Sequence, residues 1–568
     1  MLKEYMLIDK IPVLIEGEKN ILALIQKAGI DMPTFCYYSE LSVYGACRMC
    51  MVEDERGNMH AACSTPPKAG MSVVTNSARL RKYRKNILEL LLANHCRDCT
   101  TCEKSENCRL KELARRFYIE DVRFPNGKTE PERDDSSVCI SIDHSKCILC
   151  GDCVRMCNEV QNVGAIGFVG RGSKMEVGTS FNVPIANTQC VGCGQCSAVC
   201  PTGAIVVQKN VGRTWEAIYD PNTVVVAQIA PAVRAGVAKE LGEENGVIAA
   251  GKIFAAMRRM GFNYVYDTTT GADLTVTEEA EEFVERLHEG GPFPMFTSCC
   301  PAWIRYAENR HPELLPNIST CRSPMQMFGS VIKEYFGHNE KTAGKRIFSV
   351  AVMPCTAKKY EAIRPEFRRP DGTDTIDAII TTQELVQMIH EAGIDFKGIA
   401  PESSSMPFGG TSGAGVIFGV TGGVTEAVLR NVEPDKTYSA LQQIAMSGVR
   451  GLEGVKETTY PVGDTELKIA MVSGLGNAEK LIQKIQAGEA FYHLIEVMAC
   501  PRGCIAGAGQ PFAHSAEKEQ RAKNLYTTDN MTQIKRSEAN PAIDEIYAKY
   551  IGRKAHSLLH VHYKPKKN

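Results

Sequence analysis

The distribution of cysteine is the feature that most constrains this chain. Of the 23 cysteines among 568 residues, 17 lie at or before residue 200 and six lie in the remaining 368 residues. Cysteines that only pack as small apolar side chains would be scattered. A long chain without an apolar signal core at its N-terminus uses such a density for metal binding more often than for disulfides. The clustering therefore predicts several metal–thiolate sites in the N-terminal third.

Composition excludes several classes of protein. Hydrophobic residues make up 44% and charged residues 23%, which is neither a disordered nor a membrane composition. Lys and Arg number 65 against 66 Asp and Glu, so there is no basic surplus for nucleic acid or an anionic membrane. The most apolar stretch, residues 224–238, is shorter than the ~20 residues that span a bilayer. We expect a soluble, cytoplasmic protein with no nucleic-acid or membrane partner.

The first cysteine group lies in residues 1–80 and has the spacing C-x10-C-x2-C-x12-C. Four thiolates suit one small cluster, although four-cysteine sites also bind zinc. The long first gap, with Gly45 and Ala46 before the close pair, resembles the 2Fe–2S domain of plant-type ferredoxins. The expected ligands are Cys36, Cys47, Cys50 and Cys63.

The second group follows a basic, Leu-rich helix predicted over residues 79–92, within a segment spanning 81–125. It has the pattern H-x3-C-x2-C-x5-C. A histidine at this spacing before three cysteines resembles the 4Fe–4S motif that FeFe-hydrogenases share with a subunit of respiratory complex I. An imidazole in place of a thiolate should raise the potential of the cluster. The expected ligands are His95, Cys99, Cys102 and Cys108, and Cys96 has no assigned role.

The third segment, residues 126–209, contains two C-x2-C-x2-C-x3-C runs. This is the bacterial ferredoxin repeat, in which the fourth cysteine of each run binds the other cluster. Four clusters in a row indicate a path for electrons, which needs a reaction centre at its end. One 4Fe–4S cluster is assigned to Cys147, Cys150, Cys153 and Cys200, and the other to Cys157, Cys190, Cys193 and Cys196.

From residue 210 the pattern changes to alternating strands and helices. Apolar runs at 224–229, 347–353, 469–472 and 493–498 predict a mainly parallel sheet, whose carboxyl edge is the usual ligand site. Two glycine patterns, at 413–419 and 474–476, do not complete a dinucleotide-binding motif, so we expect tight turns there and no nicotinamide or flavin site. Four cysteines could hold one further 4Fe–4S cluster, with Cys299 left as a free thiol: Cys300, Cys355, Cys500 and Cys504.

Three segments around these cysteines, TSCCPAW (297–303), MPCTAKKYE (353–361) and EVMACPRGCIAGAGQP (496–511), resemble the signature segments of FeFe-hydrogenases. The order and length of all modules resemble the monomeric clostridial-type enzymes. The resemblance implies a multidomain α+β and α/β fold: a β-grasp 2Fe–2S domain (1–80), a one-His/three-Cys domain (81–125), a 2×4Fe–4S ferredoxin domain (126–209) and a large α/β catalytic domain with parallel sheets (210–568).

The resemblance also implies the cofactors and the reaction. These are one 2Fe–2S cluster, three accessory 4Fe–4S clusters and an H-cluster, whose 4Fe–4S cube is joined through Cys504 to a diiron subsite with CO, cyanide and an azadithiolate. The implied reaction is the reversible conversion of 2H⁺ and 2e⁻ to H2. The implied partners are ferredoxin or flavodoxin for electrons and maturation proteins for the diiron subsite.

Further residues are assigned by the same resemblance. Lys358 and the backbone of Ala230 and Pro231 would face the cyanides, since buried cyanides need donors. A proton relay would run from Arg286 and Glu279 near solvent through Ser319 and Glu282 to Cys299, because Glu279, Glu282 and Arg286 share one helix face. Apolar packing around the diiron subsite would come from Met353, Met498, Pro324 and Phe418.

The chain departs from the usual family pattern at a few positions. Ala302, Arg502 and Ala508 stand where glycine is common, and Met325 stands where glutamine is common. A cation at Arg502, if it faces the cube, should favour the reduced cluster. These departures affect catalytic bias and oxygen sensitivity rather than the chemistry, since no ligand is lost.

Three other functions compete with a soluble hydrogenase. A hydrogen sensor or a noncatalytic iron–sulfur assembly protein would use the same domain. A complex I-like electron-transfer subunit would share the N-terminal modules, but it leaves the cysteines from 299 to 504 unexplained. A subunit of an NAD(P)-linked hydrogenase complex would keep the chemistry and take its electrons through a separate flavin subunit.

Overall fold

The computed structural model describes residues 4–125, 133–243, 249–463 and 465–565. The chain divides into two compact units: the first comprises 1–160, 164–188 and 199–206, and the second comprises 161–163, 189–198 and 207–568. The expected domain boundary at 125/126 falls at the edge of a segment outside the described residues. In the described part, no helix is both long and apolar enough to cross a membrane.

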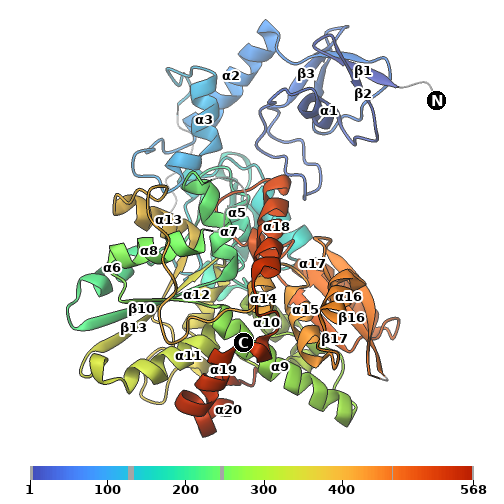
Figure 1. Cartoon of the computed structure of the whole chain (residues 1–568). Helices are drawn as coiled ribbons and strands as arrows, with labels where there is room; N and C mark the ends of the chain where they lie inside the picture. Colours follow the sequence, from blue (N-terminus) through green and yellow to red (C-terminus); the bar gives the residue numbers. More distant parts are fainter. Residues whose placement is uncertain (1–3, 126–132, 244–248, 464, 566–568) are drawn as a thin grey trace. The chain divides into compact units, whose positions relative to one another are not determined.

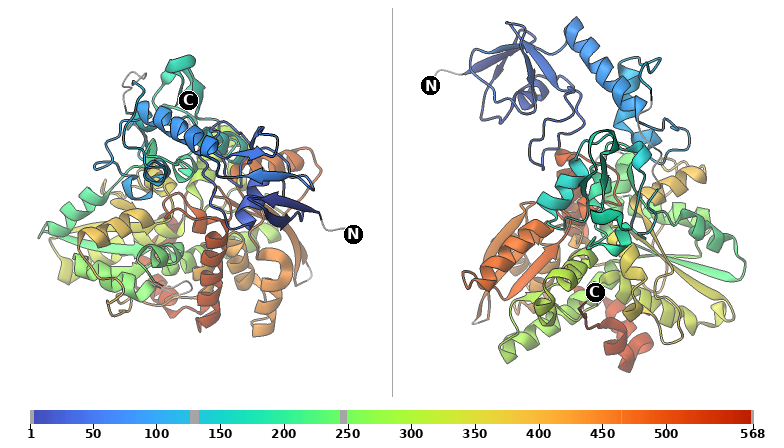
Figure 2. Two further views of the ribbon diagram at one scale, coloured as in Figure 1. Left: turned by 90° about the horizontal axis from the view of Figure 1, so that it is seen from above. Right: turned by 180° about the vertical axis from the view of Figure 1, so that it is seen from behind.

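The first unit begins with a five-stranded sheet of order β2-β1-β5-β3-β4. Strands β1 and β5 are parallel, and the other neighbours are antiparallel. Helix α1 (Ile21–Lys27) begins where the Asn20 side chain accepts a hydrogen bond from the Ala23 amide at 3.0 Å, and it buries its apolar face in the core of this sheet. Figure 2 shows the sheet and helix together. The strands are β1 (Tyr5–Ile8), β2 (Ile11–Leu14), β3 (Met51–Asp54), β4 (Met59–Ala61) and β5 (Ser72–Val74).

The predicted helix over 79–92 is present as α2 (Ala78–Ala93), capped by the Ser77 hydroxyl. It packs with α3 (Arg109–Arg116) through a small apolar core that includes Leu88 and Leu113. The His–Cys segment therefore lies between the ends of two packed helices.

The rest of the first unit is built from short elements. Strands β6 (Ile140–Ile142) and β9 (Ile205–Val207) pair, as do β7 (Gly167–Val169) and β8 (Glu176–Gly178). Helix α4 (Asp152–Arg155) continues into a π-helical turn, Met156–Val160. Short elements with little core of their own suit a domain that is held together by metal clusters.

The second unit contains two separate sheets. The first has the order β11-β10-β13-β14 with all strands parallel, and the second has the order β12-β17-β16-β15 with only β15 antiparallel. All four apolar runs expected as strands are present, as parts of β10, β13, β16 and β17. The strands are β10 (Thr223–Ile229), β11 (Tyr264–Asp267), β12 (Met295–Phe296), β13 (Arg346–Met353), β14 (Ala378–Thr381), β15 (Val455–Val462), β16 (Thr465–Ser473) and β17 (Leu494–Met498).

Helices pack against these sheets (Figure 1), and the buried apolar residues between them form several separate clusters. The longest helix, α9, is buried from Thr269 to Val276, whereas Glu285 and Glu289 near its other end are exposed. The axis of α9 therefore runs from the core towards the surface. The helices are α5 (Gln195–Ala198), α6 (Val211–Tyr219), α7 (Pro231–Glu240), α8 (Ala250–Met260), α9 (Thr269–Glu289), α10 (Pro301–Arg310), α11 (Pro324–Gly337), α12 (Ala357–Ala362), α13 (Thr382–Glu391), α14 (Gly413–Ile417), α15 (Gly423–Val432), α16 (Tyr438–Ile444), α17 (Leu475–Gln486), α18 (Ser515–Met531), α19 (Pro541–Glu545) and α20 (Ala555–Leu559).

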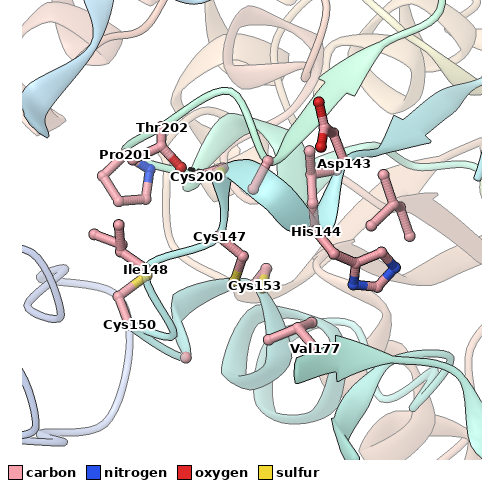
Figure 3. Close-up of a pocket in the computed structure, with 14 residues that line it drawn as sticks. Asp143, His144, Cys147, Ile148, Cys150, Cys153, Val177, Cys200, Pro201 and Thr202 are labelled. Atoms are coloured by element: carbon pink, nitrogen blue, oxygen red, sulfur yellow. Dashed lines mark hydrogen bonds between the residues drawn. The ribbon is translucent and has the colours of Figure 1, made fainter. Parts of the chain in front are cut away.

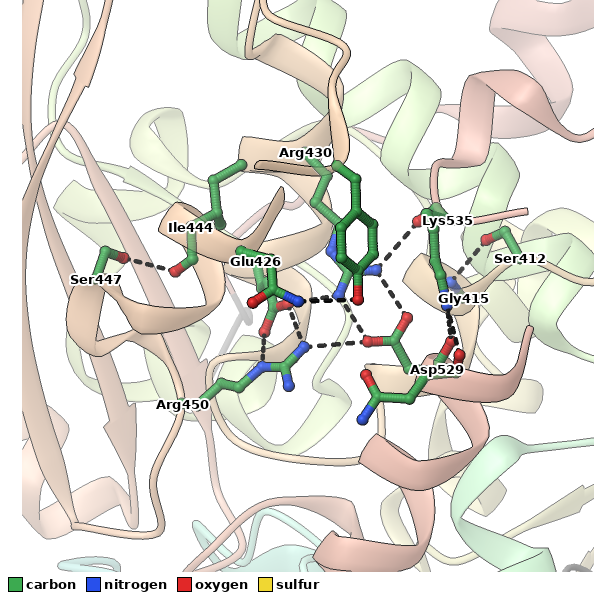
Figure 4. Close-up of polar contacts among 12 residues, drawn as sticks. Ser412, Gly415, Glu426, Arg430, Ile444, Ser447, Arg450, Asp529 and Lys535 are labelled. Carbon is green, nitrogen blue, oxygen red and sulfur yellow. Dashed lines mark hydrogen bonds and ion pairs between the residues drawn. The ribbon is translucent and has the colours of Figure 1, made fainter. Parts of the chain in front are cut away.

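Helix α18 is attached to α15 by a buried charge network (Figure 4). Arg430 lies 2.5 Å from Glu426 and 2.7 Å from Asp529, and Arg450 also pairs with both carboxylates. The glycine pattern at 413–419 forms close helix contacts here, because a Cβ on Gly413 would lie 2.0 Å from the Asp529 carboxylate. This agrees with the expectation of close packing at these glycines.

Candidate functional site

The four cysteines of the first group lie together beside the N-terminal sheet. The Cys47 amide donates to Cys36 Sγ at 3.3 Å. A hydrogen bond from the Cys36 thiol lowers the pKa of Cys47 to about 7, and one from the Cys50 thiol lowers the pKa of Cys63. The charge of Cys36 also acts on Cys50, so the two pairs are neighbours. Four thiols that share protons in this way fit a cluster that requires thiolates.

The cysteines of the second group gather at the start of α3. Burial raises the pKa of Cys108, and the charges of Cys102 and Cys99 add to the effect. Gly203 is needed beside them, because a Cβ there would lie 2.8 Å from Cys102 Sγ. His95 lies at the end of α2, where its amide donates to the Leu92 carbonyl at 3.2 Å.

Three cysteines of the first ferredoxin run and the last cysteine of the second run line one pocket (Figure 3). Burial raises the pKa of Cys150 well above its ordinary value, and the charges of Asp152, Cys200 and Cys153 act in the same direction. This is the grouping that crossed ligation of the repeat predicts. The lining cysteines are Cys147, Cys150, Cys153 and Cys200.

The second unit brings together four cysteines that are far apart in sequence. Cys300 precedes α10, Cys355 follows β13, and Cys500 and Cys504 follow β17. Burial raises the pKa of Cys500 well above its usual value, and the charges of Cys355, Cys504 and Cys300 raise it further. The Ala499 amide donates to Cys300 Sγ at 3.4 Å. None of Cys300, Cys355, Cys500 and Cys504 forms a disulfide; Cys500 is buried and the other three are half-buried. Four neighbouring thiols without a disulfide fit a metal cluster.

Lys358 supplies a positive charge beside this cysteine group. Its Nζ lies 3.2 Å from the Cys299 carbonyl and 2.7 Å from Glu361 Oε2. Burial favours the neutral amine, but the charge and the hydrogen bond of Glu361 outweigh it and raise the pKa of Lys358. The Lys358 charge in turn lowers the pKa of Cys300, Cys355 and Cys504 against the effect of their burial.

Residues 189–198, which carry the first three cysteines of the second ferredoxin run, lie beside Cys355 and Cys500 within the second unit. The Thr356 hydroxyl donates to the Gly192 carbonyl at 2.7 Å, and Gln195 Nε2 donates to the Ala506 carbonyl at 3.1 Å. The charge of Cys193 acts on Cys500. Hydrogen bonds therefore link the segments that carry the two cysteine groups.

Apolar residues that were expected around the site occupy two neighbouring clusters. Phe418 and Met498 pack with Cys299 and Cys504. Met353 and Ala230 lie in the core of the parallel sheet with Met325. Pro231 occupies the first turn of α7, and Pro324 begins α11 and lies against Gly271, where a Cβ would meet the Pro324 carbonyl at 2.2 Å.

Gly507 and Gly509 lie close to the backbone that carries Cys355. A Cβ on either would meet the backbone at Pro354, at 2.2 Å for Gly507 and 3.0 Å for Gly509. The glycines thus hold the 504–509 loop tightly against the segment that carries Cys355.

The carboxylates of α9 reach the site in the reverse of the expected order. Glu279 is buried, and burial followed by the charge of Glu282 raises its pKa to about 8. Burial raises the pKa of the Cys299 thiol, and Glu279 is the charge that raises it most. Glu282 lies farther out, 2.5 Å from Arg286, and accepts a hydrogen bond from the Ser319 hydroxyl at 3.0 Å. The expectation that Glu279 is near solvent and Glu282 next to Cys299 is therefore wrong, because α9 runs outward from the core.

Glu496 is a residue of the site that sequence reasoning missed. It is buried within β17, where it accepts hydrogen bonds from the Gly422 amide at 2.6 Å and the Thr425 amide at 2.9 Å. Its charge acts on both Cys299 and Cys504. The sequence contained an indication of this role. Glu496 is a lone carboxylate in the apolar run LIEVM, and a strand of this composition has no face exposed to solvent on which a charge would ordinarily lie.

Arg502 does not behave as expected. Its guanidinium lies 3.3 Å from Glu519 and donates to the Ser515 carbonyl at 3.4 Å, on the side of α18. Its backbone φ of 70° explains why glycine is common here, since other residues rarely adopt that conformation. The contacts point to a role in holding α18 rather than in tuning a cluster.

Five family models match the chain in the order expected from the motifs. The model described as "Iron only hydrogenase large subunit, C-terminal domain" matches residues 223–508 and "Iron hydrogenase small subunit" matches 515–566. A 2Fe-2S cluster binding domain matches 6–78, an NADH-ubiquinone oxidoreductase-G iron-sulfur binding region matches 84–123, and a 4Fe-4S dicluster domain matches 146–204.

Similar proteins span the full length of the chain. "NADP-reducing hydrogenase subunit HndD" of Solidesulfovibrio fructosivorans is 43% identical over 96% of both chains. "Iron hydrogenase 1" of Clostridium pasteurianum is 36% identical over 97% of this chain and 98% of its own length. "Cytosolic iron-sulfur assembly component 3" of Rattus norvegicus is 30% identical over 69% of this chain and 86% of its own length.

Solved structures give the same result. The FeFe-hydrogenase HydA1 from Chlamydomonas reinhardtii matches with a TM-score of 0.54 and 37% identity, covering 62% of this chain and 98% of that chain. A structure that describes stepwise H-cluster assembly matches equally well. With iron–sulfur modules, converging thiols and full-length relatives in agreement, the chain belongs to the FeFe-hydrogenase family and is a hydrogenase, an oxidoreductase acting on hydrogen.

Proposed function

We propose that the enzyme interconverts 2H⁺, 2e⁻ and H2 at an H-cluster held by Cys300, Cys355, Cys500 and Cys504. The convergence of these four thiols from three strand ends carries the proposal. When bound, the H-cluster supplies the metal centre on which protons are reduced or H2 is split. The protein binds it, packs apolar residues such as Phe418 and Met498 beside it, and delivers charge.

Side chains of the second unit have separate roles in binding the cluster and transferring protons. Lys358 donates hydrogen bonds to buried anionic ligands, since it stays charged beside Glu361. Cys299 is the inner proton donor and acceptor. Glu279 is mostly protonated at neutral pH, because its pKa is raised to about 8, and it hands protons to Cys299. Ser319, Glu282 and Arg286 lie outward of Glu279.

The accessory sites form an electron path. The proposed cofactors are one 2Fe–2S cluster in domain 1–80, one 4Fe–4S cluster in 81–125 with one histidine ligand, and two in 126–209. The sheet order β2-β1-β5-β3-β4 with its packed helix supports a β-grasp fold for the first domain. The catalytic domain takes in 210–568. Thr356 contacts Gly192, and Gln195 contacts Ala506. These contacts support electron transfer from the last accessory cluster to the H-cluster.

The electron partner separates two candidate functions. Ferredoxin or flavodoxin is the proposed partner of a cytoplasmic enzyme that works as a single chain, with maturation proteins supplying the diiron subsite. A second candidate, a subunit of an NADP-linked complex, is favoured by the 43% identity to a subunit of an NADP-reducing hydrogenase.

Assays of the purified, matured protein test both. We expect H2 evolution from reduced methyl viologen and from reduced ferredoxin, and none from NADPH alone. Activity with viologen but not with ferredoxin would favour the complex subunit. A matured protein that is inactive with viologen would contradict the proposed function and favour a sensor or assembly role.

A further inference from the structure

Glu282, the outer carboxylate of the proposed relay, needs a group that exchanges protons with solvent. Arg286 was expected to be that group, but it is poorly suited. Its guanidinium lies 2.5 Å from Glu282 Oε1 and donates to the carbonyls of Asn317 and Ile318 at 3.1 Å each. A guanidinium has five donors and no acceptor and stays protonated. Arg286 therefore fixes the carboxylate of Glu282 in place without carrying its protons.

The other carboxylate oxygen of Glu282 faces a different set of partners. Oε2 accepts hydrogen bonds from the Thr320 hydroxyl at 3.1 Å and from the Thr320 amide at 2.9 Å. The same hydroxyl lies 2.8 Å from His560 Nδ1. A hydroxyl can accept from one neighbour while donating to the other. Thr320 thus joins an imidazole to the relay by two hydrogen bonds.

The far side of the imidazole faces outward. His560 Nε2 lies 2.8 Å from Glu278 Oε2, and the His560 side chain is 11% exposed. His560 also lines an open surface groove, together with His556, which stacks on it at 4.6 Å between ring centroids. The remaining titratable or charged groups around the imidazole come from α9, the 320–322 segment and the C-terminal helices: Glu281, Cys321, Arg322 and, through Glu278, Tyr547.

Backbone contacts hold this histidine in place independently of its side chain. Cys321 and His560 form an isolated β-bridge, the Arg322 amide donates to the Leu559 carbonyl at 2.7 Å, and the Val561 amide donates to the Thr320 carbonyl at 2.7 Å. A substitution of the imidazole therefore leaves the pairing of the two segments intact.

We propose that Thr320 and His560 form the solvent end of the proton relay, between the groove and Glu282. This rests on the relay proposed above. For an inward step, the imidazole takes one proton at Nε2 from the Glu278 carboxyl that is hydrogen-bonded to it, which itself regains a proton from solvent, and releases one from Nδ1 to the Thr320 hydroxyl, which passes its own proton to Glu282. One proton enters and one leaves, so the imidazole is unchanged apart from the nitrogen that carries hydrogen. Imidazole suits this role because its ordinary pKa lies near neutrality.

The test uses His560→Gln and Thr320→Val in the matured holoenzyme, with His390→Gln on the exposed end of α13 as a matched control. We expect both variants to lose at least about tenfold in kcat for viologen-driven H2 evolution, a loss below the ~10²–10⁴ of a direct acid–base group. KM for the viologen and the infrared bands of the H-cluster should not change. Imidazole added to the buffer should restore activity to His560→Gln but not to Cys299→Ser.

Two results would overturn the proposal. One is a His560→Gln enzyme within about twofold of the wild type while Cys299→Ser is inactive, a difference of less than ~0.5 kcal/mol in the barrier. The other is a slow variant that imidazole does not rescue and whose pH profile keeps the wild-type shape, which would indicate a structural role. If Cys299→Ser is itself fully active, the failure lies in the proposed relay and not in its outlet.

Discussion

The cysteine sites of the two units are built in different ways. In the first unit, ligands are a few residues apart on short loops, and Cys147, Cys150 and Cys153 meet Cys200 around one pocket. In the second unit, Cys300 and Cys504 are 204 residues apart in sequence but follow β12 and β17, neighbouring strands of one sheet, and Cys355 joins them from the end of β13 in the other sheet. The pocket of the first unit also contains Asp143 and His144 and has Asp152 beside it, whereas the site in the second unit has a buried lysine and two buried glutamates that act on its thiols. Electron transfer needs only the metal, but proton chemistry needs titratable groups at fixed positions.

Removing one ligand from each kind of site tests this contrast most strongly. Cys355→Ser should abolish H2 evolution with every reductant, because the catalytic cluster loses a buried ligand. Cys147→Ser, its matched control, should keep most viologen-driven activity and lose ferredoxin-driven activity. Iron analysis and H2 assays with both reductants measure the effect. Equal losses in the two variants with viologen would remove the functional distinction.

Cys299→Ser separates proton transfer from metal binding inside the second unit. A hydroxyl is a much weaker acid than a thiol, so turnover should fall by about 10²–10⁴-fold. The infrared bands of the H-cluster should stay in place, since Cys299 is not a ligand. Turnover close to that of the wild type would contradict the role of this thiol.

Glu279→Gln should lower turnover by about 10²-fold, because an amide cannot release a proton. In the wild type, H2 evolution should decline as the pH rises through about 8, where Glu279 loses its proton. Its folded pKa lies above the ordinary carboxyl value, so the native state binds a proton that the unfolded state releases. The free energy of unfolding therefore falls as the pH rises from about 4.5 towards 8. Glu279→Gln should lack this decline in pH-dependent denaturation, and an unchanged slope would place the titration elsewhere.

The smallest expected effect concerns stability. Asp529→Asn should destabilise the second unit by about 3–5 kcal/mol, because it leaves the buried charge of Arg430 only partly paired. Glu545→Gln, which removes the partner of the exposed Lys549, should cost far less, because solvent screens an exposed ion pair. Anaerobic thermal unfolding followed by circular dichroism compares the two. Equal shifts in Tm would show that the network in Figure 4 does not hold α18.

Local spacing predicted that Cys147, Cys150 and Cys153 lie together, because they are close in sequence, and the ferredoxin repeat added Cys200 to them. The strands at 224–229 and 347–353 were also predictable, since their apolar runs have no polar face. Depth was not. Glu279 and Glu282 share one face of α9, and helical periodicity does not tell which end of the helix axis is buried. His560 could not be placed either, because its partner Thr320 lies 240 residues away in sequence.

Infrared spectroscopy of the matured protein and of Cys504→Ala tests most directly whether the four distant thiols bind one catalytic cluster. We predict CO and cyanide stretching bands in the wild type and their loss in Cys504→Ala, with the accessory clusters still visible by electron paramagnetic resonance. Bands that persist unchanged in Cys504→Ala would contradict the assignment of the H-cluster to this site.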